Sequence, residues 1–336
     1  MIKDAIAKAI KGENLTEADA KGAMDAIMSG EATPAQIGAF LVAMRIKGET
    51  VDEIAGCART MREKATRVTA PQEHLVDTCG TGGDSSGTFN ISTVSAFVVA
   101  GAGATVAKHG NRAASSKCGS ADVLKELGVN IEAPVEVVER CLAEVGIGFL
   151  YAPLLHGAMK HAIGPRREIG QRTIFNFLGP LTNPAGARRQ VMGVFAEELV
   201  APLAEVLGRL GAERALVVRG LDGLDEITVT GETLVAEWDG DRVNTYRVKP
   251  EDFGVPRAEA SDLLGGELAD NARIAMEVLS GEAGPRRDIV LLNAGAAIAA
   301  AGLADAIADG VALAAESIDS GAAMEKLRRL REVSAA

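Results

Sequence analysis

The 336-residue sequence has few aromatic side chains and no excess of positive charge. Aromatic residues make up 3% of the chain while 47% is hydrophobic, so the core must be built from Ala, Val, Ile and Leu. This much apolar material, with 24% charged residues, argues against intrinsic disorder. The net charge of -11 argues against a general nucleic-acid binder, which usually carries a basic excess. The length suggests about two domains.

Cysteine is scarce as well. Cys57, Cys79, Cys118 and Cys141 form no C-x-x-C pair, and with four histidines no zinc-ligand spacing is present. Reduced thiols in a cytoplasmic protein are the simplest interpretation. The first residues lack the apolar region of a signal peptide, and the longest apolar run, 294–304, is too short to span a bilayer. We therefore expect a cytoplasmic protein that does not engage a membrane.

The first seventy residues are punctuated as short helices. Thr16 is a weak capping signal, whereas Thr33 to Gln36 and Thr50 to Glu53 have the capping-box pattern. Apolar residues at helical spacing follow Thr33, and Gly48 is expected to end that helix. This pattern predicts a small all-helical domain over residues 1–70. Its apolar faces are either ordinary core or a dimer surface.

The pattern changes near Pro71 to short apolar strands that alternate with helical stretches. A helix is predicted from about Thr93 and another from a Ser120 cap to Gly128, and 234–238 with 243–248 resemble a hairpin. The remaining strands are predicted at 74–77, 105–107, 147–149, 191–194, 215–218 and 289–292. This alternation predicts an α/β domain over 71–336 with a mainly parallel central sheet.

A glycine cluster, 77–84, follows the first predicted strand and leads to Thr88-Phe-Asn90-Ile-Ser92-Thr93. Glycine lets the backbone approach a ligand closely, and free N–H groups at a helix start bind phosphate. A tight strand-to-helix turn with Ser92 as the N-cap would look similar. The side-chain donors of Asn90, Ser92 and Thr93 favour phosphate binding. The segment is neither a Walker loop nor a G-x-G-x-x-G fingerprint.

A second segment, Lys108-His-Gly-Asn-Arg-Ala-Ala-Ser-Ser-Lys-Cys-Gly-Ser120, lies between a predicted strand and a helix. Open α/β sheets place ligands at this point. The segment holds three cations and three hydroxyls within thirteen residues. A solvated basic loop is the alternative, but the small residues and hydroxyls favour an anion site.

Two further segments complete the candidate site. In 156–168, Arg166 or Arg167 could bind a carboxylate through two parallel hydrogen bonds, or could equally be a surface residue. Gly164-Pro165 and Asn183-Pro184 are expected to mark bends. Asp225 and Glu226 follow a predicted strand, and adjacent carboxylates there suit Mg²⁺ together with substrate phosphates. An acidic turn would be favoured if the phosphate loops were absent.

Taken together, these segments resemble the anthranilate phosphoribosyltransferase family. The similarity runs from the N-terminal helices to Asn293, nearly the whole chain. It is carried by 80–84, 90–93, 108–112 with Ser115 and Ser116, 119–122, the Arg166 segment and Asp225-Glu226. The order and spacing of these motifs make the resemblance strong, although each motif alone would be weak.

The resemblance implies a nucleoside phosphorylase/phosphoribosyltransferase-like architecture. A helical domain, 1–70, would be completed by part of 155–185, and an α/β domain, 71–336, would bind phosphoribosyl pyrophosphate, with the active site at the hinge. It also implies a homodimer formed through the helical domain. The implied reaction, in tryptophan biosynthesis, transfers the 5-phosphoribosyl group to the amine of anthranilate with Mg²⁺ and releases pyrophosphate.

The resemblance also implies three sets of site residues. The anthranilate set is Gly80, Asn111 and Arg166, and the metal set is Ser92, Asp225 and Glu226. The phosphoribosyl pyrophosphate set is Gly80, Gly83, Asp84, Thr88, Asn90, Ile91, Ser92, Thr93, Lys108, His109, Gly110, Asn111, Arg112, Ser115, Ser116 and Ser120. No general base is assigned. His109 is a candidate for proton handling, and a packing or hydrogen-bonding histidine is the open alternative.

Two positions depart from the family pattern, and two other functions stay open. Cys118 stands where serine is expected, which puts one hydroxyl contact near the phosphate in doubt, and Lys125 stands where glutamate is expected. A pyrimidine nucleoside phosphorylase of the same architecture would use a nucleoside and inorganic phosphate. A nucleic-acid-binding relative without activity is disfavoured by the net charge and the intact acidic pair.

Overall fold

In a computed structural model that describes residues 2–113 and 118–336, the N-terminal helices begin at the threonines that the sequence indicates. Thr16, Thr33 and Thr50 each form a complete capping box, so Thr16 is a stronger cap than predicted. Gly48, at φ 86°, ends the third helix as expected. The helices are α1 (Ile2–Ile10), α2 (Glu17–Met28), α3 (Pro34–Lys47) and α4 (Val51–Lys64).

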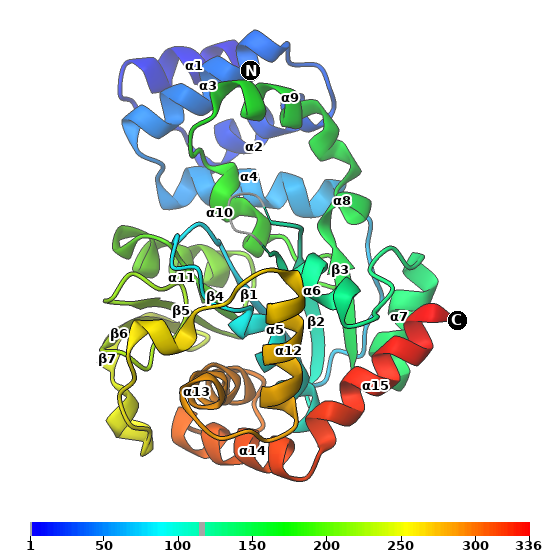
Figure 1. The fold of residues 1–336 in the computed structure, drawn as a ribbon. Helices are drawn as coiled ribbons and strands as arrows, with labels where there is room; N and C mark the ends of the chain where they lie inside the picture. The colour runs from blue at the N-terminus through cyan, green and yellow to red at the C-terminus, as the bar shows by residue number, and fades with distance from the viewer. Residues whose placement is uncertain (1, 114–117) are drawn as a thin grey trace.

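These four helices form a bundle at one end of the molecule (Figure 1). A helix from much later in the chain, α9 (Lys160–Ile169), packs against α2 and α3. The bundle is fixed to the larger unit through Arg62 on α4, whose guanidinium donates to the carbonyls of Leu181 and Leu210 at 2.7 and 2.9 Å. Leu210 caps the C-terminal end of α11, where carbonyls lack partners within the helix.

The larger unit is built on a seven-stranded sheet with the order β3-β2-β1-β4-β5-β6-β7. The first five strands are parallel, and β6 and β7 add an antiparallel hairpin at one edge. The predicted fold class is therefore confirmed. The strands are β1 (Leu75–Gly80), β2 (Thr105–Gly110), β3 (Ile147–Tyr151), β4 (Arg189–Gly193), β5 (Arg214–Gly220), β6 (Thr233–Trp238) and β7 (Val243–Val248).

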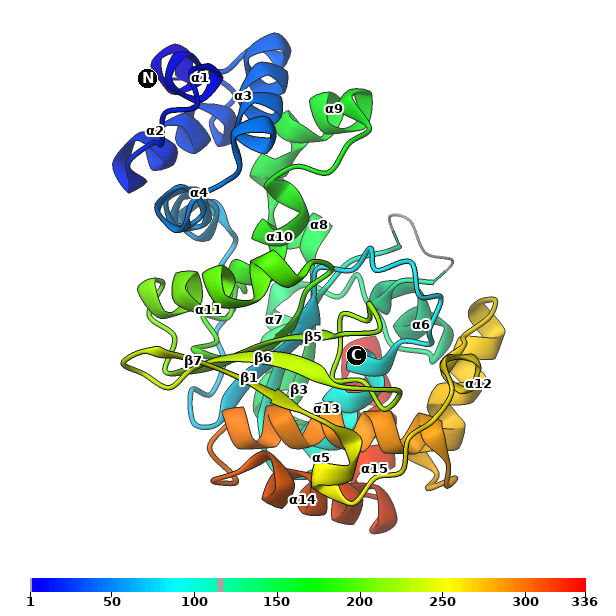
Figure 2. The same cartoon turned by 90° about the vertical axis from the view of Figure 1, so that its left-hand side faces the viewer.

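Helices cover both faces of this sheet (Figures 1 and 2). On one face, α5 and α13 pack against the central strands, and Val76 of β1 points into that core. On the other face lie α7 and α11, and the core under α11 is continuous with that of the N-terminal bundle. The longer helices of this unit are α5 (Ile91–Gly101), α6 (Ser120–Glu126), α7 (Val135–Glu144), α11 (Val200–Arg209), α12 (Leu268–Leu279), α13 (Pro285–Ala300), α14 (Ile307–Asp319) and α15 (Ala322–Ala335). Short turns of helix complete the chain: α8 (Ala152–Leu155), α10 (Phe175–Leu178) and the 3₁₀ segments Gly157–Met159, Gly179–Leu181, Glu197–Leu199, Pro250–Phe253 and Ala260–Leu263.

Three local predictions are wrong. The strand predicted at 289–292 lies inside α13, because an apolar run buried on every side has no period that separates strand from helix. Gly164-Pro165 lies within α9 instead of bending the chain. The N-cap of α6 is Gly119 rather than Ser120. At the start of α5 the N-cap is Asn90, so the alternative of a turn capped by Ser92 does not describe this segment.

Within the residues that the structure describes, no helix combines the length and apolar character that a membrane crossing requires. All four cysteines are buried, and none forms a disulfide with another described residue.

Candidate active site

The carboxyl ends of β1 and β4 and the turn after β5 meet around the acidic pair. Gly82 follows β1 and donates its N–H to Asp225 Oδ2 at 2.9 Å. Gly193, the last residue of β4, lies so close to this turn that a Cβ there would be 1.6 Å from the carbonyl oxygen of Asp225. A Cβ on Gly80 would lie 2.8 Å from Asp225 Oδ2. Glycine is therefore required at this junction for the acidic turn to approach the phosphate loop.

The glycine loop leads into the N-terminal end of α5, as phosphate binding requires. Gly82 and Gly83 have φ values of 64° and 78°, which glycine adopts without strain. Glu226 Oε1 accepts a hydrogen bond from the N–H of Ser92 at 3.1 Å, in the first turn of the helix. The structure thus brings Ser92, Asp225 and Glu226, the predicted metal set, to one place.

The carboxylates at this place are poorly compensated. Burial, followed by the charge of Asp84, raises the pKa of Asp225 to about 7. Burial and the charge of Asp225 raise the pKa of Glu226 to about 8. Asp84 Oδ2 is buried without a hydrogen-bond partner among the described residues. Three carboxyl groups gathered in a buried place, where the charge of Lys108 opposes the rise in the pKa of Glu226 only in part, suit a divalent cation.

The donor set suits Mg²⁺ rather than a metal held by protein groups alone. Among the described residues there is no cluster of three or more histidine, cysteine or carboxylate side chains placed to hold a metal. Mg²⁺ commonly takes one or two carboxylates and completes its octahedron with waters and substrate phosphates. Asp225, Glu226 and the Ser92 hydroxyl fit that pattern.

Lys108 provides the positive charge closest to the acidic pair. Its side chain is buried in β2, and Nζ donates to the carbonyl of Thr78 at 2.6 Å and to Ser92 Oγ at 3.4 Å. Burial lowers the pKa of Lys108, while the charges of Asp77 and Glu226 oppose that shift. Lys108 therefore sits between the strand end and the helix start, where a phosphate oxygen would be neutralised.

His109 is paired with a second histidine that the sequence analysis did not assign. His109 Nε2 lies 3.1 Å from His156 Nε2, so one ring donates to the other. Burial lowers the pKa of His109 to about 3, with a further contribution from His156, and burial lowers the pKa of His156 to about 4. Both rings are neutral near pH 7. His109 is therefore a weak base, and the hydrogen-bonding role gains weight over proton transfer.

The other predicted phosphate-site residues divide into three groups. Thr88, Asn90, Thr93, Gly110 and Ser120 lie on the two loops or at the starts of α5 and α6. The side chain of Ile91 is buried and its N–H is bonded to the carbonyl of Phe89, so neither faces a ligand. Ser115 and Ser116 lie outside the described residues.

Arg112 and Asn111 differ in how free their side chains are to bind a ligand. The guanidinium of Arg112 donates to the Tyr151 hydroxyl at 2.9 Å and lies 3.5 Å from a carboxylate oxygen of Glu132. It is thus committed to protein partners. Asn111 is exposed, and its Oδ1 accepts from the N–H of Arg112 at 2.7 Å.

Of the two candidate arginines, only Arg166 is partly buried and packed against an aromatic ring. It is half-buried on α9, and its guanidinium carbon lies 4.9 Å from the centre of the Phe175 ring. Burial lowers its pKa, and it forms no ion pair with any described residue. Arg167 is exposed. A charged guanidinium that is half-buried over an aromatic ring without a carboxylate can accept one from a ligand.

Arg172 lies in the segment after α9 and joins it to the glycine loop. Its guanidinium donates to the carbonyl of Gly83 and stacks 4.3 Å from the centre of the Phe195 ring. The sequence analysis did not single out Arg172, because an exposed arginine outside a motif carries no local signal.

The positioning role of two other buried residues, Asp77 and Asn183, was not predicted from the sequence. Asp77 Oδ1 accepts from the N–H of His109 at 3.1 Å, and Asp77 Oδ2 accepts from Asn183 Nδ2 at 2.7 Å. This pair fixes β2, which carries Lys108 and His109. The available signal was a carboxylate inside an apolar strand, since a buried charge needs fixed partners.

The two departures from the family pattern have little chemical consequence. The Cys118 side chain is buried, and burial raises the pKa of its thiol to about 11, so it is not a thiolate. Its carbonyl accepts from Asn90 Nδ2 at 3.1 Å, a contact independent of the side chain. Lys125 is exposed on α6, so its effect is limited to surface charge.

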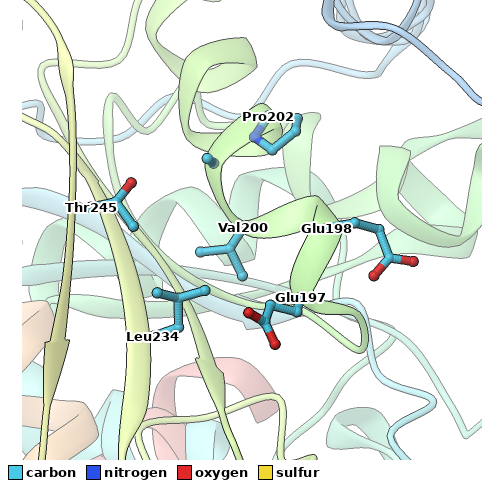
Figure 3. Close-up of a pocket in the computed structure, with 7 residues that line it drawn as sticks. Glu197, Glu198, Val200, Pro202, Leu234 and Thr245 are labelled. Atoms are coloured by element: carbon cyan, nitrogen blue, oxygen red, sulfur yellow. The ribbon is translucent and has the colours of Figure 1, made fainter.

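A surface pocket lies away from the candidate active site. It has a volume of about 490 Å³ at the start of α11 beside β6 and β7, and Glu197 and Glu198 are among the residues that line it (Figure 3). None of the predicted site residues lines it. Volume alone therefore does not locate the active site in this ligand-free chain.

Comparison with known proteins matches both units of the fold. Residues 3–65 match "Glycosyl transferase family, helical bundle domain", and residues 72–324 match "Glycosyl transferase family, a/b domain". Anthranilate phosphoribosyltransferase from Moorella thermoacetica is 58% identical over 330 residues, which cover 98% of this chain and 97% of that protein.

Solved structures of the same enzyme have the same fold. The Thermus thermophilus enzyme superposes with a TM-score of 0.94 at 48% identity, over 99% of this chain and 100% of that chain. The Saccharomyces cerevisiae enzyme in complex with PRPP and Mg superposes with a TM-score of 0.90 at 28% identity, over 99% and 98%. A further structure of the yeast enzyme holds 4-fluoroanthranilate, with a TM-score of 0.89 at 27% identity, over 99% and 97%.

Proposed function

The chain belongs to the anthranilate phosphoribosyltransferase family, and on that premise we propose that it transfers the 5-phosphoribosyl group of phosphoribosyl pyrophosphate to the amine of anthranilate. The products are N-(5-phosphoribosyl)anthranilate and pyrophosphate, and the reaction belongs to tryptophan biosynthesis. The observation that carries the proposal is the convergence of the glycine loop, Lys108 and the Asp225-Glu226 pair at one sheet edge.

The donor end of the reaction follows from this convergence. The glycine loop after β1 and the ammonium of Lys108 bind the phosphates of the donor substrate. Ser92, Asp225 and Glu226 hold Mg²⁺, which when bound neutralises the charge that develops on the pyrophosphate leaving group. Displacement at the ribose C1 develops oxocarbenium character while negative charge builds up on the leaving pyrophosphate. These residues therefore lower the barrier mainly by stabilising that leaving group.

The acceptor end calls for positioning more than for acid–base catalysis. The neutral amine of anthranilate is already a nucleophile, so holding it near C1 supplies much of the rate. Arg166 would bind the carboxylate, with Asn111 and the open face of Gly80 orienting the ring. His109 and His156, both neutral near pH 7, would contribute hydrogen bonds rather than a cation.

One assay separates this proposal from its rivals. Purified protein is mixed with anthranilate, phosphoribosyl pyrophosphate and Mg²⁺, and the loss of anthranilate fluorescence is followed. The proposal expects the signal to fall and to stop on addition of excess EDTA. Release of a free pyrimidine base from a nucleoside and inorganic phosphate would instead identify a phosphorylase. Salt-sensitive DNA binding without turnover would identify the nucleic-acid-binding alternative.

We also propose that two copies associate through the helical bundle. Ile10 on α1 and Ile46 on α3 are 71% and 82% exposed, and Val42 and Ile163 add exposed apolar surface on α3 and α9. Val42 and Ile46 lie one turn apart on the same face of α3, and α1 and α9 both pack against this helix. An apolar region of this kind commonly marks a protein interface.

Reduced cysteines agree with the cytoplasmic location that we propose for the dimer.

A further inference from the structure

Asn293 on α13 binds the backbone of the acidic turn. The residue is 3% exposed. Its Oδ1 accepts a hydrogen bond from the N–H of Ile227 at 2.9 Å, and its Nδ2 donates to the carbonyl of Ile227 at 2.9 Å. The same Nδ2 also donates to the carbonyl of Ile289, one turn earlier in α13, at 2.9 Å. One side chain therefore satisfies both polar groups of the residue that directly follows Glu226.

Only an amide side chain suits this position. It must accept from one backbone group and donate to two others, and Asn has one acceptor oxygen and two donor hydrogens. An aspartate would present oxygen to the carbonyls of Ile227 and Ile289. An apolar residue of similar size would leave all three backbone groups buried without partners, which destabilises the local structure.

Packing alone does not hold the turn on the side of α5. A cavity of about 10 Å³, near the lower limit for a single water, is lined in part by Ser95, Glu226 and Asn293. Ser95 Oγ is buried there without a hydrogen-bond partner among the described residues. The acidic turn could relax into this space if its connection to α13 were removed.

We infer that Asn293 is a positioning residue, which fixes the Asp225-Glu226 carboxylates in the arrangement that binds the divalent cation. The inference rests on the proposed function of that pair. Residues that orient metal ligands typically change metal affinity by 10- to 100-fold when they are replaced. A purely structural role for Asn293 would change stability but leave metal affinity as it was.

The test measures metal binding directly. Mn²⁺ replaces Mg²⁺, and free Mn²⁺ is quantified by electron paramagnetic resonance in the presence of phosphoribosyl pyrophosphate and without anthranilate, so that no turnover occurs. The variants are Asn293→Ala and Asn293→Ser. Ile298→Ala is the matched control, because Ile298 is buried on the same helix without contacting the turn through any described hydrogen bond. Melting temperature and the Mg²⁺ dependence of turnover are recorded for each folded variant.

We expect Asn293→Ala to weaken Mn²⁺ binding about 10-fold or more. Turnover should recover in part at high Mg²⁺, with less than about a 2-fold change in KM for anthranilate. Ile298→Ala should lower the melting temperature while keeping wild-type Mn²⁺ affinity. Equal Mn²⁺ affinity in wild type and Asn293→Ala would overturn the inference. If Asn293→Ala fails to fold, Asn293→Ser, which keeps one small hydrogen-bonding group at this position, gives the same comparison. Wild-type protein that binds no Mn²⁺ with the donor substrate would instead contradict the proposed metal site itself.

Discussion

At the scale of single residues, Arg166 has the most specific role in our account. We expect Arg166→Ala to raise KM for anthranilate, because a charged hydrogen-bonding contact to the carboxylate, worth about 1.5–3 kcal/mol, is lost. Binding of phosphoribosyl pyrophosphate, measured by calorimetry, should change much less, since Lys108 and the glycine loop hold it. The exposed Arg167 provides the control, Arg167→Ala, which should behave as wild type. If Arg166→Ala weakens donor binding and spares KM for anthranilate, Arg166 belongs to the phosphate site.

The acidic pair determines how the site responds to pH. The pKa values of Asp225 and Glu226 lie near 7 and 8 without metal, above their usual values, so both carboxyls bind protons more tightly in the folded chain than in the unfolded chain. The stability they contribute is fully present below the ordinary pKa values of 3.8 and 4.5, and it is lost as pH rises to about 8. The affinity for the metal changes in the opposite direction and rises with pH, because only the deprotonated carboxylates are ligands.

We therefore expect Mn²⁺ affinity to increase between about pH 6 and pH 9, while the melting temperature in EDTA decreases between about pH 5 and pH 8. Titrations of metal at several pH values, with scanning calorimetry in EDTA, measure both trends. The variant Asp225→Asn with Glu226→Gln should lose the pH dependence of melting that the pair causes. Metal affinity that is flat across this range would show that the two carboxylates are ionised throughout.

The sequence predicts the charged residues that stand in or beside the glycine-rich motifs, and it misses residues whose role depends on a contact with a distant segment. Asp225, Glu226 and Lys108 were predicted because ionisable side chains beside glycine-rich loops commonly bind phosphate or a metal ion. Asn293 and Gly193 were not, since an amide or a glycine has a function only relative to a backbone segment far away in the sequence. Their contacts exist because parallel strands bring distant segments to one edge.

At the scale of elements, the segment after α9 connects the acceptor region to the glycine loop. We expect Arg172→Ala to weaken phosphoribosyl pyrophosphate binding about 5-fold, because one hydrogen bond of about 1 kcal/mol to the carbonyl of Gly83 is lost. Arg172→Lys should not restore affinity, since stacking on Phe195 needs a planar guanidinium. Calorimetric titration of the donor substrate measures the change. Wild-type affinity in Arg172→Ala would mean that the loop keeps its shape unaided.

Helix starts and hairpins were predictable elements, whereas the innermost helix was not. Thr33 and Thr50 signal helix starts through local chemistry, and Asp239-Gly240 signals the turn between β6 and β7. The run 289–292 has no polar face because α13 is surrounded by core. Its type is determined by its neighbours, and a single sequence does not contain that information.

At the scale of the whole molecule, association through the helical bundle is the open proposal. We expect Ile46→Asp to convert a dimer into a monomer, because a charge on this highly exposed apolar side chain opposes its burial in an interface. Leu221→Asp is the control, as Leu221 is 40% exposed on the α/β unit outside the bundle. Light scattering after size-exclusion chromatography gives the mass of each. A wild-type monomer, or an Ile46→Asp dimer, would place the interface elsewhere or exclude it.

The central claim is that the sheet edge holding Asp225 and Glu226 carries out the transfer. Its most direct test compares the rate of anthranilate fluorescence loss, with donor substrate and Mg²⁺ present, between wild type and the folded variant Asp225→Ala with Glu226→Ala. We predict steady consumption by the wild type and a rate at least about 100-fold lower in the variant, a barrier difference of about 2.7 kcal/mol. Circular dichroism establishes that the variant is folded. No consumption by the wild type, or an undiminished rate in the folded variant, would contradict the account.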